Sequence, residues 1–261
     1  MRNHRSLTIA CLISSSLIIL PGVQAADAYP GTKSEWHGFK LYEYEHTKIV
    51  VPETVAHGKP WVWRARFFDL KPGFDIAMLN QGYHVVYCDV TDLFGSPKAV
   101  ARWDEFYDTL RNEFGFAEKA IVSGMSRGGL IMYNWAIANP DKVAALYGDA
   151  PVMDFKSWPG WWDKRVLQSY GFKSHEEALA YEGNPLDNLE PLAKANIPII
   201  HVVGDLDDIV PVAENTGPAE KKYKALGGTF VVIHKPDAKH DHGLADPTPL
   251  VNFVLRHDKH E

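Results

Sequence analysis

Apolar runs rich in valine, isoleucine and aromatic residues alternate along the chain with longer stretches of helical period, and this order limits the possible folds more than any other feature. The runs that fit strands are Leu41 to Val51, Pro60 to Ala65, Tyr83 to Cys88, Ala120 to Ser123, Val143 to Tyr147, Ile197 to Val203 and Thr229 to His234. The stretches that fit helices are Asp69 to Gln81, Ala99 to Phe114, Arg127 to Ala138, Ala213 to Leu226 and Pro249 to Arg256. This alternation predicts an α/β fold with a mostly parallel central sheet flanked by helices.

One stretch, residues 151–191, interrupts the alternation. It contains Trp158, Trp161 and Trp162 and a polar helical segment near Glu176 to Tyr181, but no run that fits a central strand. Such a stretch is either a surface loop whose aromatic rings pack on the core or an insertion that forms a wall of a substrate cleft. We expect the second, a short Trp-rich cap.

The first 25 residues have the pattern of a secretory signal peptide. Arg2 and Arg5 give a basic start, Leu7 to Leu20 is apolar and Ser-rich, and Val23-Gln24-Ala25 offers small residues for cleavage. A membrane helix needs about 20 apolar residues, and Pro21-Gly22 ends this run earlier. We therefore expect residues 1–25 to be removed, leaving one domain over residues 26–261 that is secreted or periplasmic and has no membrane attachment.

Charge and cysteine content narrow the partners and the source of stability. The chain has a formal charge of −6, and loss of Arg2 and Arg5 makes it about −8. An acidic chain repels phosphate backbones, so nucleic acid is not an expected partner. Cys88 is the one cysteine beyond the predicted cleavage site, so the mature chain has no internal disulfide and depends on core packing.

The sharpest motif is Gly124-Met125-Ser126-Arg127-Gly128-Gly129, which follows an apolar strand run and opens a helical stretch. Gly-x-Ser-x-Gly in this position is typical of a nucleophile elbow, where glycines relieve collisions in a tight strand-to-helix turn. The turn directs the hydroxyl of Ser126 away from the sheet. The backbone N–H of Arg127 then faces a developing oxyanion.

A serine nucleophile needs a histidine base and an orienting acid, which in this fold follow in the order Ser, acid, His. Three aspartates compete after the run Ile197 to Val203, namely Asp205, Asp207 and Asp208. We expect Asp205 to brace the loop instead.

Three histidines compete after the next strand. We expect His234, inside the strand alternation, to be a packed and hydrogen-bonded side chain, whereas His240 in the following loop is favoured as the base and His242 stays an alternative. His240 and His242 also have the spacing of a metal pair, but no third ligand is evident, so we expect neither metal nor cofactor.

The second oxyanion donor should come from the loop after the strand run Pro60 to Ala65, with the backbone N–H groups of Ala65 and Arg66 as candidates. Among nearby side chains, we expect Trp63, Arg64, Trp158 and Trp161 to bind substrate. Tryptophan offers flat faces to sugar rings, and arginine pairs with carboxylates.

Four linked motifs, including the elbow, resemble those of a group of secreted bacterial α/β hydrolases, and the resemblance covers nearly the whole mature chain. The other three are Gly58-Lys59-Pro60-Trp61-Val62-Trp63-Arg64-Ala65, Gly148-Asp149-Ala150-Pro151 and His242-Gly243-Leu244-Ala245-Asp246-Pro247-Thr248-Pro249. That group includes carbohydrate esterases similar to pectin methyl esterases. The resemblance implies an α/β-hydrolase fold and a triad of Ser126, Asp207 and His240. The family pattern Gly-x-x-Asp-x-x-Val-Pro, which Gly204, Val210 and Pro211 match, favours Asp207 over Asp205 and Asp208 as the acid.

From these features we expect a secreted serine esterase that removes methyl or acetyl groups from a polysaccharide, or acts on a smaller ester. The alternatives are a serine peptidase of the same fold and a non-catalytic carbohydrate-binding protein. A peptidase of this fold usually carries a domain that screens substrates, for which 261 residues leave no room. A non-catalytic relative would normally lack a triad member.

Overall fold

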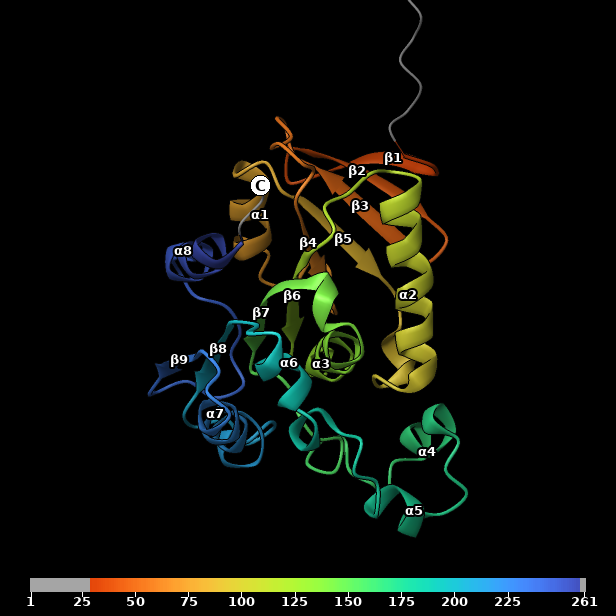
Figure 1. Cartoon of the computed structure of the whole chain (residues 1–261), viewed down its shortest axis with the longest axis vertical. Helices are drawn as coiled ribbons and strands as arrows, with labels where there is room; N and C mark the ends of the chain where they lie inside the picture. Colours follow the sequence, from red (N-terminus) through yellow and green to blue (C-terminus); the bar gives the residue numbers. More distant parts are fainter. Residues whose placement is uncertain (1–28, 259–261) are drawn as a thin grey trace, which may run out of the picture.

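The computed structural model describes residues 29–258, which form one nine-stranded sheet with helices on both faces (Figure 1). The predicted signal peptide, residues 1–25, lies outside the described residues. The strands are β1 (Thr32–Trp36), β2 (Phe39–Tyr44), β3 (Thr47–Val51), β4 (Trp61–Arg64), β5 (His84–Cys88), β6 (Ala120–Met125), β7 (Val143–Asp149), β8 (Ile199–Gly204) and β9 (Phe230–Lys235).

Eight α-helices accompany these strands in the described chain. They are α1 (Gly73–Asn80), α2 (Pro97–Asn112), α3 (Gly128–Ala138), α4 (Lys164–Tyr170), α5 (His175–Leu179), α6 (Glu190–Lys194), α7 (Thr216–Ala225) and α8 (Thr248–His257). Short 3₁₀ turns occupy Thr91–Leu93, Pro140–Lys142, Pro185–Asp187 and Val212–Glu214. Within residues 29–258, no helix combines the length and apolar character needed to span a bilayer.

The strand order is β1-β2-β3-β5-β4-β6-β7-β8-β9. Strands β1, β2 and β3 pair antiparallel, and β3 also pairs antiparallel with β5. The six strands β4 to β9 run parallel to one another. The predicted α/β fold with a mostly parallel sheet is therefore confirmed. Because parallel strands end at the same edge, the loops that follow β6, β7, β8 and β9 gather there.

The antiparallel edge is the part that the sequence pattern describes least well. The run Leu41 to Val51 forms the hairpin β2–β3, which turns at Glu45 and His46, but β1 is missing from the predicted strands. Four of its five residues are exposed, so it lacks the apolar signal of a buried strand.

Period-2 alternation divides the core into two layers. Trp61 and Trp63 of β4 face α2 and α3, and the indole of Trp63 stacks on that of Trp103 with ring centroids 4.0 Å apart. Val62, between them, joins the layer beneath α1 and α8. Helices therefore cover both faces of the sheet, which leaves the central strands β4 to β8 buried on both sides.

The interrupting stretch, residues 151–191, contains α4, α5 and part of α6 and none of the nine strands. Phe155, Val166 and Ala178 pack there with Phe94 and Leu130 in a small cluster of their own. In Figure 1, α4 and α5 lie at the periphery of the molecule, away from the sheet.

A buried arginine holds the connection between β4 and α1. The Arg64 guanidinium, 3% exposed, donates to the carbonyl oxygens of Phe67 (2.9 Å) and Leu70 (2.6 Å) and to the Asp75 carboxylate (2.6 Å). These bonds fix residues 66–70 in a loop, so α1 begins at Gly73 rather than at the predicted Asp69.

We expect Asp75→Ala to lower the free energy of unfolding by about 3–5 kcal/mol, because it leaves a buried guanidinium without its counter-charge. Glu190→Ala, which breaks an exposed ion pair with Lys194 on one helix turn, should cost less than about 0.5 kcal/mol. Urea unfolding of both variants measures the difference. Equal losses would contradict the structural role of Arg64.

Two buried histidines predict a loss of stability in acid. Burial lowers the pKa of His84 to about 4 and that of His201 to about 3, whereas an unfolded histidine titrates near 6.5. Below pH 6.5 the unfolded state therefore binds protons that the folded state does not bind. The free energy of unfolding that these histidines contribute above pH 6.5 is lost as the pH falls.

We expect each of these histidines to lower the unfolding free energy by up to about 1.4 kcal/mol per pH unit as the pH falls from about 6.5 toward about 4. His84→Gln should remove its share of this slope, while the exposed His57→Gln should not change it. Urea unfolding between pH 7 and 4.5 gives the slopes. An unchanged slope in His84→Gln would show that His84 takes up its proton as readily in the folded state as in the unfolded state.

Candidate active site

Ser126 lies in a strained turn between β6 and α3. Its φ is +51°, a left-handed conformation, and its N–H donates to the carbonyl oxygen of Asp149 at 2.8 Å. A Cβ on Gly124 would lie 2.9 Å from the carbonyl oxygen of Gly128. The turn is thus as tight as the motif predicts, and it needs glycine on the strand side.

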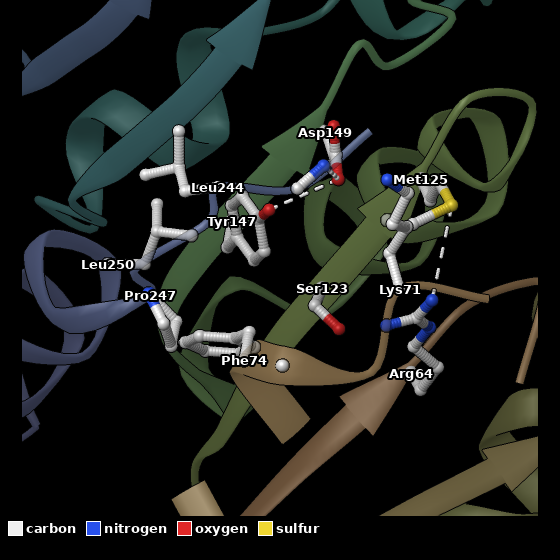
Figure 2. A pocket seen from close by; sticks show the side chains of 13 residues that line it. Arg64, Lys71, Phe74, Ser123, Met125, Tyr147, Asp149, Leu244, Pro247 and Leu250 are labelled. Atoms are coloured by element: carbon white, nitrogen blue, oxygen red, sulfur yellow. Dashed lines mark hydrogen bonds between the residues drawn. The ribbon is translucent and has the colours of Figure 1, made fainter. Parts of the chain in front are cut away.

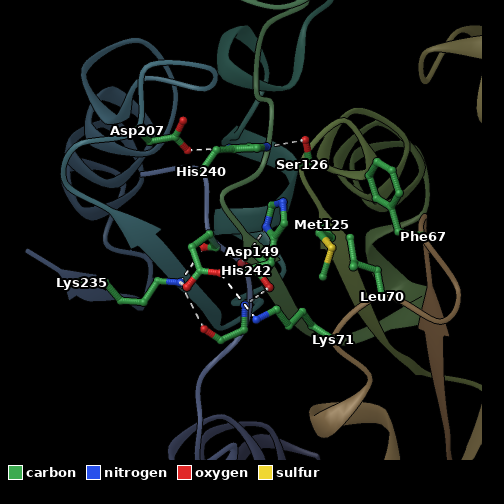
Figure 3. Close-up of polar contacts among 12 residues, drawn as sticks. Phe67, Leu70, Lys71, Met125, Ser126, Asp149, Asp207, Lys235, His240 and His242 are labelled. Carbon is green, nitrogen blue, oxygen red and sulfur yellow. Dashed lines mark hydrogen bonds and ion pairs between the residues drawn. The ribbon is translucent and has the colours of Figure 1, made fainter. Parts of the chain in front are cut away.

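The loops after β8 and β9 bring an acid and a histidine to this serine. The hydroxyl of Ser126 lies 3.0 Å from Nε2 of His240, and Nδ1 of His240 lies 2.6 Å from Oδ2 of Asp207 (Figure 3). The other Asp207 oxygen accepts the N–H groups of Ile209 and Val210, both at 2.9 Å. These bonds fix a carboxylate that is 1% exposed and hold the imidazole toward Ser126.

The competing aspartates and histidines lie elsewhere. The Asp208 carboxylate is 69% exposed, and Asp205 pairs with His234 at 2.6 Å, which braces the loop through a side chain. His234 is hydrogen-bonded as predicted, but it is exposed rather than packed, because β9 is the edge strand. His242 contacts Asp149 at 3.3 Å.

Close approach between two loops sets the position of His240. A Cβ on Gly204, the last residue of β8, would lie 2.1 Å from the carbonyl oxygen of Lys239. The N–H of Leu206 also donates to the carbonyl oxygen of Ala238 at 3.0 Å. Glycine at the end of β8 therefore lets the histidine loop reach the acid loop.

Two backbone N–H groups at the elbow have no acceptor among the described residues. One belongs to Arg127, which follows Ser126, and the other to Arg66, whose N lies 3.5 Å from the position of a Cβ on Gly128. The lack of an acceptor is the state required of oxyanion donors. The predicted alternative, Ala65, is wrong, because its N–H donates to the carbonyl oxygen of Ser123 at 2.8 Å and extends the pairing of β4 with β6.

Three arginines gather beside these donors on two phenyl rings. The guanidinium carbons of Arg66 and Arg127 lie 4.5 and 5.9 Å from the ring centroid of Phe67. Those of Arg127 and Arg165 lie 5.9 and 5.4 Å from that of Phe94. Burial, with the neighbouring charges of Arg66 and Arg165, lowers the pKa of Arg127.

Sequence reasoning missed Arg165, Phe67 and Phe94. Their loops are far apart in the chain, and no motif links them. Arg165 is paired with the Asp163 carboxylate at 2.6 Å, whereas Arg66 and Arg127 form no ion pair among the described residues.

Two predicted substrate contacts are wrong. The Trp63 side chain is fully buried in the core. The Arg64 guanidinium is buried and donates its hydrogen bonds to Asp75 and to the carbonyl oxygen of Phe67, not to a substrate. Both lie on a central strand covered on both faces. Trp158 and Trp161 are half-buried. The ring centroid of Trp158 lies 6.5 Å from that of Phe94, and the ring centroid of Trp161 lies 5.5 Å from that of Trp162. Their predicted contact with substrate stays a prediction.

We expect Asp207→Asn to lower kcat for p-nitrophenyl acetate by about 10⁴, because an amide no longer fixes the histidine tautomer that takes the serine proton. Asparagine keeps an oxygen for the N–H groups of Ile209 and Val210, so the loop should stay folded. Asp208→Asn is the matched control and should retain parent activity. A similar loss in both variants would contradict the assignment of Asp207.

Comparison with solved structures places the fold among known proteins. The chain is similar to Pyrococcus horikoshii acylaminoacyl peptidase, with a TM-score of 0.62 and 17% sequence identity over 89% of this chain. It is also similar to Porphyromonas gingivalis dipeptidyl peptidase 4, with a TM-score of 0.60 and 16% identity over 84% of this chain. The matches cover 42% and 34% of those proteins. No curated protein sequence matches the chain.

The structural likeness confirms the predicted α/β-hydrolase fold, since both neighbours share the sheet and its flanking helices. The prolyl oligopeptidase family matches residues 105–255, a segment that runs from α2 to α8 and includes Ser126, Asp207 and His240. The chain is thus an α/β-fold serine hydrolase and belongs to the prolyl oligopeptidase family.

Proposed function

We propose that this chain hydrolyses peptide bonds through an acyl-enzyme formed on Ser126. The observation that carries the proposal is the continuous relay from the Ser126 hydroxyl through His240 to the buried Asp207 carboxylate. Membership in a peptidase family and likeness to two peptidases favour a peptide substrate over the esterase predicted from sequence.

The geometry supports a two-step reaction. His240 accepts the Ser126 proton at Nε2 while the serine oxygen attacks the scissile carbonyl carbon, and Asp207 stabilises the resulting imidazolium. The N–H groups of Arg66 and Arg127 stabilise the oxyanion. His240 then gives its proton to the leaving amine. Water, deprotonated by the same histidine, attacks the acyl-enzyme and releases the acid.

A second candidate is the predicted ester hydrolase, which would remove methyl or acetyl groups from a polysaccharide. The guanidinium groups of Arg66 and Arg127 favour it, because they form no ion pair among the described residues and suit an acidic sugar next to the reacting ester. Trp162, 57% exposed, offers a flat face for a sugar ring. Under this candidate, the signal-like residues 1–25 would export the enzyme to its polymer.

Three substrate classes distinguish these candidates. We expect Ser126-dependent cleavage of acyl-peptide p-nitroanilides and of unmodified peptides, followed by absorbance and mass spectrometry. Release of methanol from pectin or of acetate from acetylated xylan, without peptide cleavage, would favour the esterase. Activated esters such as p-nitrophenyl acetate report the triad alone, because either class of enzyme hydrolyses them.

We expect Ser126→Ala to lower kcat for the cleaved substrate by about 10⁶ and to abolish labelling by a fluorophosphonate. The parent protein should be labelled at Ser126. Binding of carbohydrate with neither labelling nor turnover would instead support a non-catalytic binding protein. Activity that survives Ser126→Ala within tenfold would exclude the proposed mechanism.

A further inference from the structure

Two motifs without a role in the triad meet beside it. Asp149 of the Gly148-Asp149-Ala150-Pro151 motif ends β7, and its carboxylate is 4% exposed. Its oxygens lie 3.3 Å from Nδ1 of His242 and 2.8 Å from the backbone N of Gly243, both in the histidine loop (Figure 3). Tyr147 donates a third bond through its hydroxyl at 3.2 Å.

The donors around Asp149 are matched to a carboxylate. Burial and the neighbouring carboxylate raise the pKa of Tyr147 well above its ordinary value, so its hydroxyl keeps its proton and donates. An ionised carboxylate only accepts, so His242 must carry its proton on Nδ1. Asp149 therefore fixes both the tautomer and the position of His242.

The main chain of Asp149 holds the nucleophile at the same time. Its carbonyl oxygen accepts the N–H of Ser126 at 2.8 Å. The next residue, Ala150, has a φ of +43° and donates its N–H to the carbonyl oxygen of Val202 in β8. One residue thus connects the backbone of Ser126 to the loop that carries His240, and its neighbour anchors it to the sheet.

His242 in turn packs against the base. The two imidazole rings lie edge to face, with centroids 4.5 Å apart and planes at 77°. Between them in the chain, Asp241 faces Lys71 (3.6 Å) and Lys235 (3.5 Å), whose charges lower the pKa of Asp241. The residues on either side of His242 are therefore both held, Asp241 by the two lysines and Gly243 by Asp149.

Packing alone does not support this side of the loop. A cavity of about 90 Å³ lies between the end of β6 and the histidine loop, and its wall includes Met125, Tyr147, Asp149, Gly243 and Leu244 (Figure 2). Side chains are not in continuous contact across this space. The bonds of Asp149 supply a connection that close packing would otherwise provide.

We propose that Asp149 and His242 are a positioning pair that holds the His240 imidazole in line with Ser126. The proposal rests on the triad of the proposed function. A displacement of about 1 Å in a reacting group costs up to about 100-fold in rate, so the loss of a bond that orients His240 should appear in kcat.

The test compares His242→Phe with His242→Asn, using hydrolysis of p-nitrophenyl acetate and the rate of fluorophosphonate labelling. Phenylalanine keeps a ring against His240 but donates no bond to Asp149, and we expect kcat to fall about 10- to 100-fold with KM within about twofold of parent. Asparagine places an N–H near the position of Nδ1 and should restore kcat to within about fivefold. Labelling rates should follow the same order.

The matched control is His57→Phe, which makes the same change at an exposed histidine in the loop before β4, outside the loops of the triad, and should retain parent kcat. Melting temperatures show that each variant is folded at the assay temperature. Asp149→Asn is a second probe, because its amide keeps an acceptor for Gly243 and should retain more activity than Asp149→Ala.

Parent turnover that depends on Ser126, together with parent-like kcat in folded His242→Phe, would overturn the positioning role and leave the proposed function intact. Equal losses in His242→Phe and His242→Asn would also overturn it, since the bond to Asp149 would then not matter. Turnover independent of Ser126 would overturn both the proposed function and this inference.

Discussion

The hydrogen bond from the N–H of Ser126 to the carbonyl oxygen of Asp149 is the contact on which the site depends. Ser126 has a left-handed backbone that costs about 1–3 kcal/mol, and such a conformation persists only when its surroundings enforce it. Here β7 provides the acceptor, and the glycine at 124 lets the turn close. The same turn aims the hydroxyl at His240 and leaves the N–H of Arg127 unengaged. The strained turn at Ser126 thus serves both the proton transfer to His240 and the stabilisation of the oxyanion.

Parallel strands explain how distant segments reach this turn. Ser126 and His240 are 114 positions apart, yet each follows a strand whose end lies at one edge of a single sheet. Helices cover both faces, so the strands are rigid and their loops carry the chemistry. The histidine loop depends on its neighbours rather than on regular structure of its own, and the contacts of Gly204 and Asp149 supply its support.

Two guanidinium groups lie at the site of a chain that is acidic as a whole. The formal charge is −6, but Arg66 and Arg127 lie at Phe67 beside the oxyanion donors and form no ion pair among the described residues, whereas Arg165 is paired with Asp163. Salt screens exposed charges beyond about 8 Å under physiological conditions. An anionic group bound here would therefore respond to these arginines more than to the acidic surface at a distance.

The sequence by itself determined the α/β order, the elbow and a short list of partners. Alternation of strand and helix patterns follows from which side chains must be buried, and Gly-x-Ser-x-Gly follows from backbone sterics, so both are local. The choice of Asp207 and His240 was favoured by the resemblance to a family pattern, but only the approach of the β8 and β9 loops brought them to Ser126. The roles of Trp63, Arg64 and Ala65 were decided by tertiary structure alone. Period-2 alternation shows that neighbours point to opposite faces, but it does not show that helices cover both faces or where strand pairing ends.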